Sequence, residues 1–594
     1  MRWPGGRNAP RPGTVVVWVV AGIALVLVVG AAWVGTRALL ARDELQSAVP
    51  LATRIQDQVV AGDADGATAT AADLRRRAGN AADLTSDPVW RAAEVVPLLG
   101  PNLTAVRELA AVADDISRRA VTPLTQIAGT VDLDSVKPVQ GIIDVQPLVE
   151  AQPQIAAASA ALNSAEARVR GIETDQTIGA VKEAAQTLHS AVTEAVKGTD
   201  ILNRAAQIMP SMLGAAGPRN YILLFQNPAE LRSTGGIPGA LGLVHTENGR
   251  MDLTQQASTP DFPPQPSPVV PLPADTVNLY GDITGRSIQN INLTPDFTLT
   301  ARLAQEMWRQ QFGVQADGVI SVDPVALSYL LGVTGPITLD TGDVMSAGNA
   351  VQLLLSDAYR RYPNPADQDV FFANAATAVF EAFARGNADP KEMIGALAKA
   401  GDEGRVLVWN ANTQDQAVLA DTTLSGSLPV SDERATRFGV YLNDATGGKM
   451  GIYLKSQVGV GRANCPGSDG TSYGVSLDLT NTAPADAATS LPSYVTASGN
   501  FGVTPGNVRT IVSVYGAPGM RVEGITRDGT EVPYQPSADS GYPVSALSVE
   551  LEPGQTTQLY FRWSAAERKA GDLFAQTTPV IDREETARVR LECE

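Results

Sequence analysis

Arg232 is the residue of this chain with the clearest potential to bind an anion. It lies in the segment LRSTGGIPG, shortly after the apolar run Tyr221–Phe225 (YILLF), which has the composition of a buried strand. A Gly-rich turn can present backbone N–H groups, and a guanidinium beside them can bind a phosphate or diphosphate through charged hydrogen bonds. The sequence therefore predicts an anion site that includes Arg232, Gly235 and Gly236. The segment matches neither a Walker A loop nor a dinucleotide-binding fingerprint.

Carboxylates and further arginines of the same region could complete a diphosphate site. Oxygen ligands from aspartates hold Mg²⁺ against phosphates, so Mg²⁺ is the cofactor that this pattern suggests. The alternative for each residue is structural, because isolated aspartates often cap helices or turns and isolated arginines often form surface ion pairs. The aspartates at predicted strand or loop ends are Asp261, Asp282, Asp296 and Asp317, and the additional arginines are Arg286, Arg302, Arg360 and Arg361.

The histidine content argues against several catalytic mechanisms. The chain has two histidines, His189 and His245, whereas Ser-His-Asp and Cys-His catalysis both require a histidine base. His189 lies in an Ala-rich helical segment, and His245 lies in the strand-like LGLVHTENG with no evident partner. Catalysis by this chain would therefore depend on carboxylates, arginines and a bound metal ion.

The N-terminal segment predicts a membrane anchor. Residues 14–36 carry no charge, and Val15–Val34 is almost wholly apolar, close to the roughly 20 residues that a helix needs to cross a bilayer. Three arginines within residues 1–13 favour a cytoplasmic tail. The apolar run is longer than a typical signal-peptide core, although a cleaved signal would place the remainder in the same compartment. We predict a single-pass cell-membrane protein with its bulk outside the cytoplasm.

The remaining chain predicts three extracytoplasmic regions and a multidomain α+β fold. Residues 37–213 are rich in good helix formers and predict a helical bundle or stalk. Residues 214–425 alternate strand and helix patterns, which indicates a mixed α/β domain. Residues 426–594 contain short strands between turns, for example Gly451–Leu454 and Gly474–Thr480, and predict a β-sandwich-like domain.

Charge and cysteine content restrict the partners. The formal net charge is −18, which argues against nucleic-acid binding, because no basic face is available to neutralise phosphates. Cys465 and Cys593 both lie in the C-terminal region. An oxidising compartment would allow them to form a disulfide, and two free thiols are the alternative. No third or fourth soft ligand lies near the cysteines, so a structural metal site there is not expected.

Several long motifs resemble the bacterial DUF4012 family, which has no established activity. The resemblance runs from the predicted anchor to about residue 560. The segment DPVWRAAEVVPLLGPNLTAVREL is similar to the helical part of actinobacterial members. The other motifs are NYILLFQNPAELRSTGGIPGALG, TPDF at 294–297, ADGVISVDPVALSYLLGVTGPITL and AGNAVQLLLSDAYRRYP.

The order of these motifs also bears a weaker resemblance to the LytR-CpsA-Psr fold. That resemblance implies transfer of a lipid-diphosphate-linked glycopolymer to peptidoglycan, with arginines and Mg²⁺-binding aspartates. It matches Asp369 to the family's aspartate, so Asp296 and Asp369 become the metal candidates. Phe371, Phe372 and Asn374 stand near positions where that family has arginines, and STGGIPG replaces its SIPRD-type signature.

Two functions follow from these observations. The first is a membrane-anchored envelope protein that binds or handles a lipid-diphosphate-linked glycopolymer or another wall polymer, as a phosphotransferase-like enzyme if it is catalytic. The second is a non-catalytic envelope scaffold or adhesion protein. A deep apolar groove that ends at Arg232 would favour the first, and a flat acidic surface would favour the second.

Overall fold

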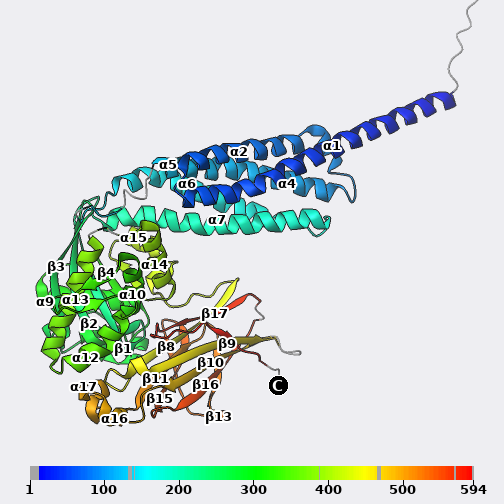
Figure 1. The fold of residues 1–594 in the computed structure, drawn as a ribbon. Coiled ribbons are helices and arrows are strands. Elements are labelled where there is room, and N and C mark those ends of the chain that lie inside the picture. The colour runs from blue at the N-terminus through cyan, green and yellow to red at the C-terminus, as the bar shows by residue number, and fades with distance from the viewer. Residues whose placement is uncertain are drawn as a thin grey trace, which may run out of the picture. The chain divides into compact units, whose positions relative to one another are not determined.

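The computed structural model describes residues 12–130, 137–139, 141–384, 386, 388–464, 470–567 and 570–591 (Figure 1). The chain folds into two compact units. Unit 1 comprises Met1–Asp132 and Gln146–Met209, and unit 2 comprises Leu133–Val145 and Pro210–Glu594. The predicted mixed α+β class is confirmed. Both Cys465 and Cys593 lie outside the described residues, so their disulfide stays a prediction.

Unit 1 is a helical bundle whose helices pack through small side chains. Alanines of α2, such as Ala71 and Ala78, are fully or almost fully buried, which lets neighbouring helices approach closely. The helices of unit 1 are α1 Pro12–Val60, α2 Ala64–Thr85, α3 Pro88–Ala93, α4 Gly100–Ile116, α5 Thr122–Thr130, α6 Gln146–Arg170 and α7 Gly179–Met212, with a π turn at Ser117–Val121 between α4 and α5.

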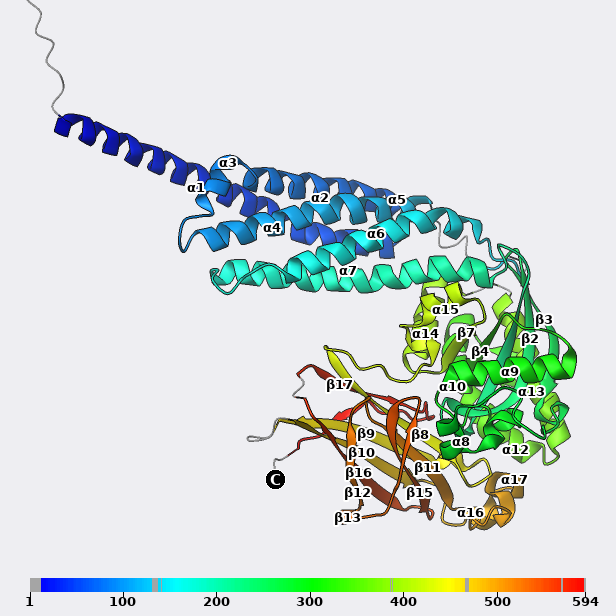
Figure 2. The same cartoon turned by 180° about the vertical axis from the view of Figure 1, so that it is seen from behind.

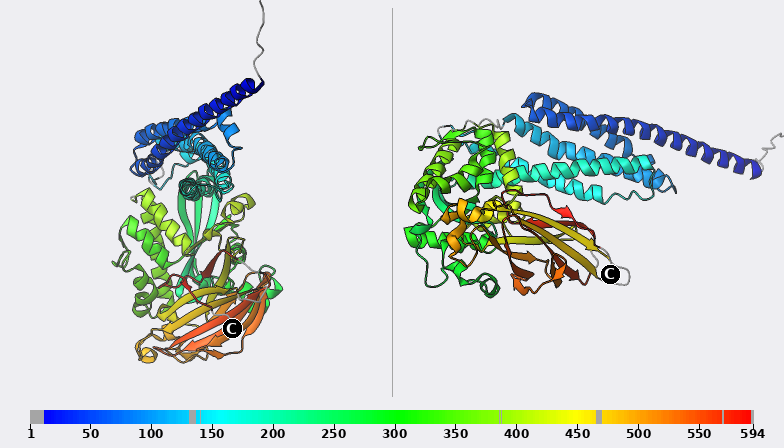
Figure 3. Two further views of the ribbon diagram at one scale, coloured as in Figure 1. Left: turned by 90° about the vertical axis from the view of Figure 1, so that its right-hand side faces the viewer. Right: turned by 60° about the horizontal axis from the view of Figure 1, so that its bottom comes forward.

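Helix α1 is continuous for 49 residues. Its N-terminal part extends beyond the other helices of unit 1 (Figures 1 and 3). Among the described residues it is the one helix with the length and apolar composition of a membrane span. The predicted anchor therefore coincides with this projecting part, and the helix continues past residue 36 into the bundle instead of ending there.

The first half of unit 2 is built on a five-stranded sheet with helices on both faces. Strand β1 runs parallel to β4 and antiparallel to β2. Alternate residues of β1 face opposite sides. Ile222 and Leu224 pack with α9 in one core, while Leu223 and Phe225 face the opposite helices. The strand order is β3 Arg250–Ser258, β2 Gly235–Glu247, β1 Arg219–Arg232, β4 Gly318–Val322 and β7 Val406–Asn410. The main helices are α9 Phe297–Phe312, α10 Pro324–Thr334, α12 Ala358–Arg361, α13 Pro365–Ala384 and α14 Pro390–Asp402.

The second half of unit 2 is a β-sandwich with one shared core (Figure 2). Phe438, Val475 and Phe561, from both sheets, are completely buried together. One sheet has the order β14 Gln535–Asp539, β15 Tyr542–Leu551, β11 Val508–Tyr515, β8 Ala435–Asp444 and β17 Asp572–Thr577. The other has the order β13 Thr530–Glu531, β12 Arg521–Arg527, β16 Thr556–Ala565, β10 Thr471–Asn481, β9 Leu454–Ala463 and β18 Ala587–Arg588.

The two strand predictions named above for this region have different outcomes. Gly474–Thr480 lies within β10, as predicted. The prediction for Gly451–Leu454 is wrong, because Met450–Tyr453 form a 3-10 turn and only Leu454 begins β9. A Cβ on Gly451 would lie 2.5 Å from the carbonyl oxygen of Pro228. This turn packs too closely against the end of β1 to run as an open strand.

Candidate functional site

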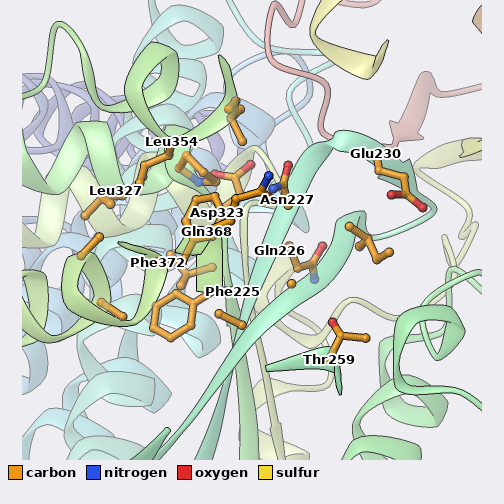
Figure 4. A pocket seen from close by; sticks show the side chains of 18 of the residues that line it. Phe225, Gln226, Asn227, Glu230, Thr259, Asp323, Leu327, Leu354, Gln368 and Phe372 are labelled. Atoms are coloured by element: carbon orange, nitrogen blue, oxygen red, sulfur yellow. The ribbon is translucent and has the colours of Figure 1, made fainter. Parts of the chain in front are cut away.

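An apolar cavity of about 830 Å³ lies within unit 2, between the sheet and its helices. The sheet contributes Phe225 from β1, and the helices contribute Leu327 and Phe372. Figure 4 shows these side chains together at one end of the cavity, with Glu230 at the other end and Gln226 and Asn227 between them. Further apolar lining comes from Leu223, Leu253, Ile320, Val322, Leu330, Leu354, Val379, Phe380 and Phe383. We call this space the apolar cavity.

The far end of the apolar cavity carries a cluster of buried charges. The Glu230 carboxylate accepts a hydrogen bond from Arg232 Nη2 at 2.8 Å and one from Lys449 Nζ at 2.6 Å. The three side chains are 12%, 7% and 9% exposed. Asp444 and Asn290 line the cavity beside them. We call Glu230, Arg232, Asp444 and Lys449 the charged cluster. It gives the cavity a charged end, whereas Asp323, Gln368 and Asp369 are polar residues that line it elsewhere.

Burial and neighbouring charges shift the pKa values of this cluster in different directions. Burial alone would raise the pKa of Glu230, but the Lys449 and Arg232 charges outweigh burial and hold this pKa below its ordinary value. Burial alone would lower the pKa of Lys449, and the Glu230 charge raises it above normal instead. Burial, together with the Glu230 charge, raises the pKa of Asp444 to about 6. Glu230 and Lys449 are therefore charged, whereas Asp444 titrates close to neutrality.

Arg232 has an unused donor at this end of the cavity. Its Nη1 donates to the Leu231 carbonyl at 2.9 Å, and its Nη2 also lies 3.4 Å from Asn290 Oδ1. Its Nε is buried and has no hydrogen-bond partner among the described residues. A buried N–H group of a cation that lacks an acceptor is costly. Arg232 Nε is therefore a buried donor that the described residues leave unsatisfied.

The Gly-rich segment is a tight hairpin between β1 and β2, in which Arg232 pairs with Gly235. A Cβ on Gly236 would lie 2.1 Å from the carbonyl carbon of Asn227, so this position needs glycine. The Gly236 N–H donates to Gln226 Oε1, and the Ser233 N–H donates to Asn443 Oδ1, both at 3.0 Å. These two N–H groups are therefore engaged within the protein, and Arg232 is the part of the predicted anion site that lines the cavity.

The other predicted arginines do not line the apolar cavity. Arg286 pairs with Asp282 at 3.3 Å, and Arg361 pairs with Asp343 at 2.5 Å. Arg302 and Arg360 are exposed. The structure does not bring these four arginines together with Arg232 at the cavity.

The predicted metal candidates have different environments. Asp296 caps α9 by accepting a hydrogen bond from the Thr298 N–H at 2.9 Å, whereas Asp369 is partly buried and lines the apolar cavity. Burial raises the pKa of both carboxyls. Within the described parts of the chain, no group of three or more His, Cys, Asp or Glu side chains could hold a metal ion. These residues therefore provide no set of ligands that would support the Mg²⁺ prediction.

The remaining aspartates have structural partners. Asp261 accepts a hydrogen bond from the Ser258 N–H at 2.7 Å, and Asp317 accepts one from the Asn220 N–H at 2.8 Å. The Asp261 contact matches the capping alternative for isolated aspartates, whereas the Asp317 contact joins the residue before β4 to β1.

The sequence reasoning missed Glu230, Asp444 and Lys449. Glu230 lies two residues before Arg232 on one strand, a spacing that places both on one face, so this pair had a readable signal. Lys449 is 219 residues from Glu230 and lies in a turn of the β-rich region, and no local pattern links it to β1.

Asp444→Asn is expected to stabilise unit 2 near neutral pH. A carboxyl whose pKa rises on folding, here to about 6, costs stability progressively as pH rises from the unfolded-state pKa through the folded-state pKa. The cost above that window is about 3 kcal/mol. Asparagine keeps an acceptor for the Gly447 N–H, which lies 2.7 Å from Asp444. Urea unfolding should show the variant to be more stable than the parent at about pH 7.5 and similar to it at about pH 4. An equal difference at both pH values would contradict this assignment.

Comparison with known proteins gives one family match. Residues 216–359 match the family model described as "Protein of unknown function (DUF4012)". This match confirms the DUF4012 resemblance over a shorter part of the chain than the sequence motifs suggested. It contains β1, β2, the Arg232 hairpin and part of the cavity wall. No curated protein and no solved structure matches the chain.

Proposed function

We propose that this DUF4012 protein binds a membrane lipid with an anionic head, of the polyprenyl-diphosphate type, in the apolar cavity. The observation that carries the proposal is a cavity of about 830 Å³ whose mainly apolar walls end at Arg232, Glu230 and Lys449. The hydrocarbon chain lies along Phe225 and Phe372, and the phosphates lie at the charged cluster.

The walls of the cavity suit a hydrocarbon chain. Leucine, valine and phenylalanine side chains from both the sheet and the helices face the space, and most of its lining residues are apolar. Binding a hydrocarbon chain buries apolar surface on both sides, which is favourable. A long apolar cavity with a few convergent polar groups is typical of a site for an amphipathic ligand.

The polar end suits a phosphate or diphosphate. Two buried cations share one carboxylate, and Arg232 Nε has no acceptor among the described residues. Phosphate oxygens accept charged hydrogen bonds from such groups. Protonation of Asp444, whose pKa is about 6, removes a negative charge and leaves this end more positive. A phosphorylated head placed here would also favour the protonated Asp444.

The anchor helix sets the cellular context of this proposal. Helix α1 supplies the membrane anchor, and the part of unit 1 beyond the anchor lies outside the cytoplasm together with unit 2. The lipid would then carry a glycan or another envelope polymer. We propose binding of this molecule and not its transfer, because Phe372, near a position where LytR-CpsA-Psr proteins have an arginine, forms part of the apolar wall.

Ligand binding by the full-length protein in detergent tests the proposal. Native mass spectrometry would compare geranylgeranyl diphosphate, geranylgeraniol and inorganic diphosphate as probes. The diphosphate lipid should bind most tightly, because only this probe occupies both ends of the site. Arg232→Gln should weaken its binding about 10- to 100-fold, the value of a charged hydrogen bond or two.

Matched variants separate the two ends of the site. Phe372→Asp places a charge in the apolar wall and should weaken binding of both lipids, whereas Asp444→Asn should preserve or strengthen binding of the diphosphate lipid. Arg302→Gln, an exposed arginine outside the cavity, should leave all affinities unchanged. Absence of lipid binding by the folded parent protein would reject the proposal and favour the scaffold function.

A further inference from the structure

We propose that the apolar tip of unit 1 inserts into the outer surface of the same bilayer that α1 crosses. The tip comprises Val95–Leu99, in the α3–α4 connection, and Ile178, the last residue of the α6–α7 connection. Val95 is 82% exposed, Leu98 is 87% exposed, and Leu99 and Ile178 are each 61% exposed. Such large apolar side chains exposed together mark an interaction surface.

The tip lies at the end of the bundle from which the anchor leaves. Arg37, one residue past the uncharged segment of α1, donates through Nε to the Leu84 carbonyl at 2.8 Å and through Nη2 to the Asp83 carbonyl at 2.9 Å. Its Nε also forms an ion pair with Asp87 at 2.9 Å. These contacts fix the end of α2 and the start of α3 beside Arg37. Figure 2 shows α3 beside α1 at this place.

Aromatic and charged residues of α1 mark the same level as a membrane interface. Trp33 is 50% exposed, and the Arg37 guanidinium lies 5.1 Å from the centre of its ring. Tryptophan and arginine side chains are typical of the boundary between hydrocarbon and water. The connection that follows α3 therefore lies near the predicted interface and not far out in solvent.

The tip is held in a defined shape. Leu98 has a φ of +70°, which is unusual for a residue with a side chain. The Leu98 carbonyl accepts a hydrogen bond from Asn102 Nδ2 at 3.0 Å, and Asn102 Oδ1 accepts one from the Ile178 N–H at 2.8 Å. Asn102 thus joins the two connections that form the tip, and the structure keeps their apolar side chains outward.

The distribution of charged residues around the tip favours lipid as its partner. Residues 95–106 carry no charged side chain, so the connection can enter the interface without burying a charge. The flanking Glu94 and Arg107 pair with each other at 2.6 Å. Glu173 and Asp175, in the α6–α7 connection, are exposed and stay on the aqueous side. Only the apolar tip is inserted. Together with α1 it gives unit 1 a second membrane contact and a fixed orientation.

Photo-crosslinking of the full-length protein tests this proposal. Variants with p-benzoylphenylalanine at position 95 or at position 98 are reconstituted into phosphatidylcholine–phosphatidylglycerol vesicles that contain radiolabelled phosphatidylcholine. The control carries the same residue in place of the exposed Val59, which lies 22 residues beyond Arg37 on the same helix, about 33 Å away. Flotation with the vesicles first establishes that α1 anchors each variant.

Lipid adducts at position 95 or position 98, with none at position 59, are the expected result. Absence of an adduct at both tip positions, or equal labelling at position 59, would overturn the proposal. Crosslinks between two copies of the protein in place of lipid adducts would also overturn it. Failure to float would reject α1 as the anchor and this inference with it, without bearing on lipid binding in the apolar cavity.

Discussion

Replacement of Arg405 by methionine is expected to lower the free energy of unfolding of unit 2 by about 3–5 kcal/mol, the cost of leaving a buried charge without its partner. The Arg405 and Asp323 side chains are each 1% exposed, and Nη1 lies 2.9 Å from Asp323 Oδ2. Arg405 Nε also pairs with Glu403, and Nη2 donates to the Val580 carbonyl at 2.7 Å. One guanidinium therefore connects the α/β sheet to the segment that follows β17.

Urea unfolding of the full-length protein, followed by tryptophan fluorescence, measures this loss. Arg309→Met is the matched control, because Arg309 pairs with Glu306 on an exposed face, where ion pairs contribute about 0–1 kcal/mol. Adding Asp323→Asn to the Arg405 variant should restore part of the stability, because it removes the unpaired charge. The asparagine keeps the cap of α10, in which Asp323 Oδ1 accepts a hydrogen bond from the Ala326 N–H at 2.7 Å. Equal losses for the Arg405 variant and the control would contradict the assignment.

Glu230→Gln is expected to destabilise unit 2 by a similar amount, about 3–5 kcal/mol. The substitution keeps the shape of the side chain but leaves Arg232 and Lys449 without the carboxylate to which both are hydrogen-bonded, although Gln can still accept one of the two hydrogen bonds. The pKa of Lys449, which Glu230 raises, should then fall, because burial of the ammonium would dominate. Thermal and urea unfolding measure the loss.

Inorganic diphosphate provides the functional readout of the same variant. Two buried cations without their carboxylate should bind the anion more tightly, so millimolar diphosphate should raise the melting temperature of the Glu230→Gln variant more than that of the parent. Sulfate at matched ionic strength controls for general screening. No difference between variant and parent would show that these cations do not face the cavity as an anion site.

The sequence could predict the elements that position the site but not the site itself. The run YILLF indicated a buried strand, and its alternation produces both the α9 core and the cavity wall. The cavity depends on the distance between the other face of the sheet and helices α10, α12, α13 and α14, and no periodicity within a single segment encodes that distance. The glycines of the LRSTGGIPG segment predicted a turn whose N–H groups could bind an anion. In the structure Gln226 and Asn443 accept hydrogen bonds from these N–H groups.

Long-range packing accounts for the other differences. Gly451–Leu454 has the composition of a short strand, yet Met450 is completely buried and the backbone of Gly451 lies against the end of β1. Contact with a distant strand therefore fixed a 3-10 turn there. The anchor prediction depends only on the length and polarity of one segment, so the position of the anchor could be predicted from the sequence. The continuation of α1 to Val60 could not.

The unbroken path of α1 from the apolar span into the bundle restricts how this protein can change in length. Each residue added to a helix turns everything beyond it by about 100° and lifts it by about 1.5 Å. One residue inserted between Trp33 and Ala48 would turn Trp33 and the apolar span by about 100° relative to the side of α1 that is buried in the bundle at Ala48. Natural variation in this stretch should therefore come as whole helical turns, and single insertions or deletions should be rare.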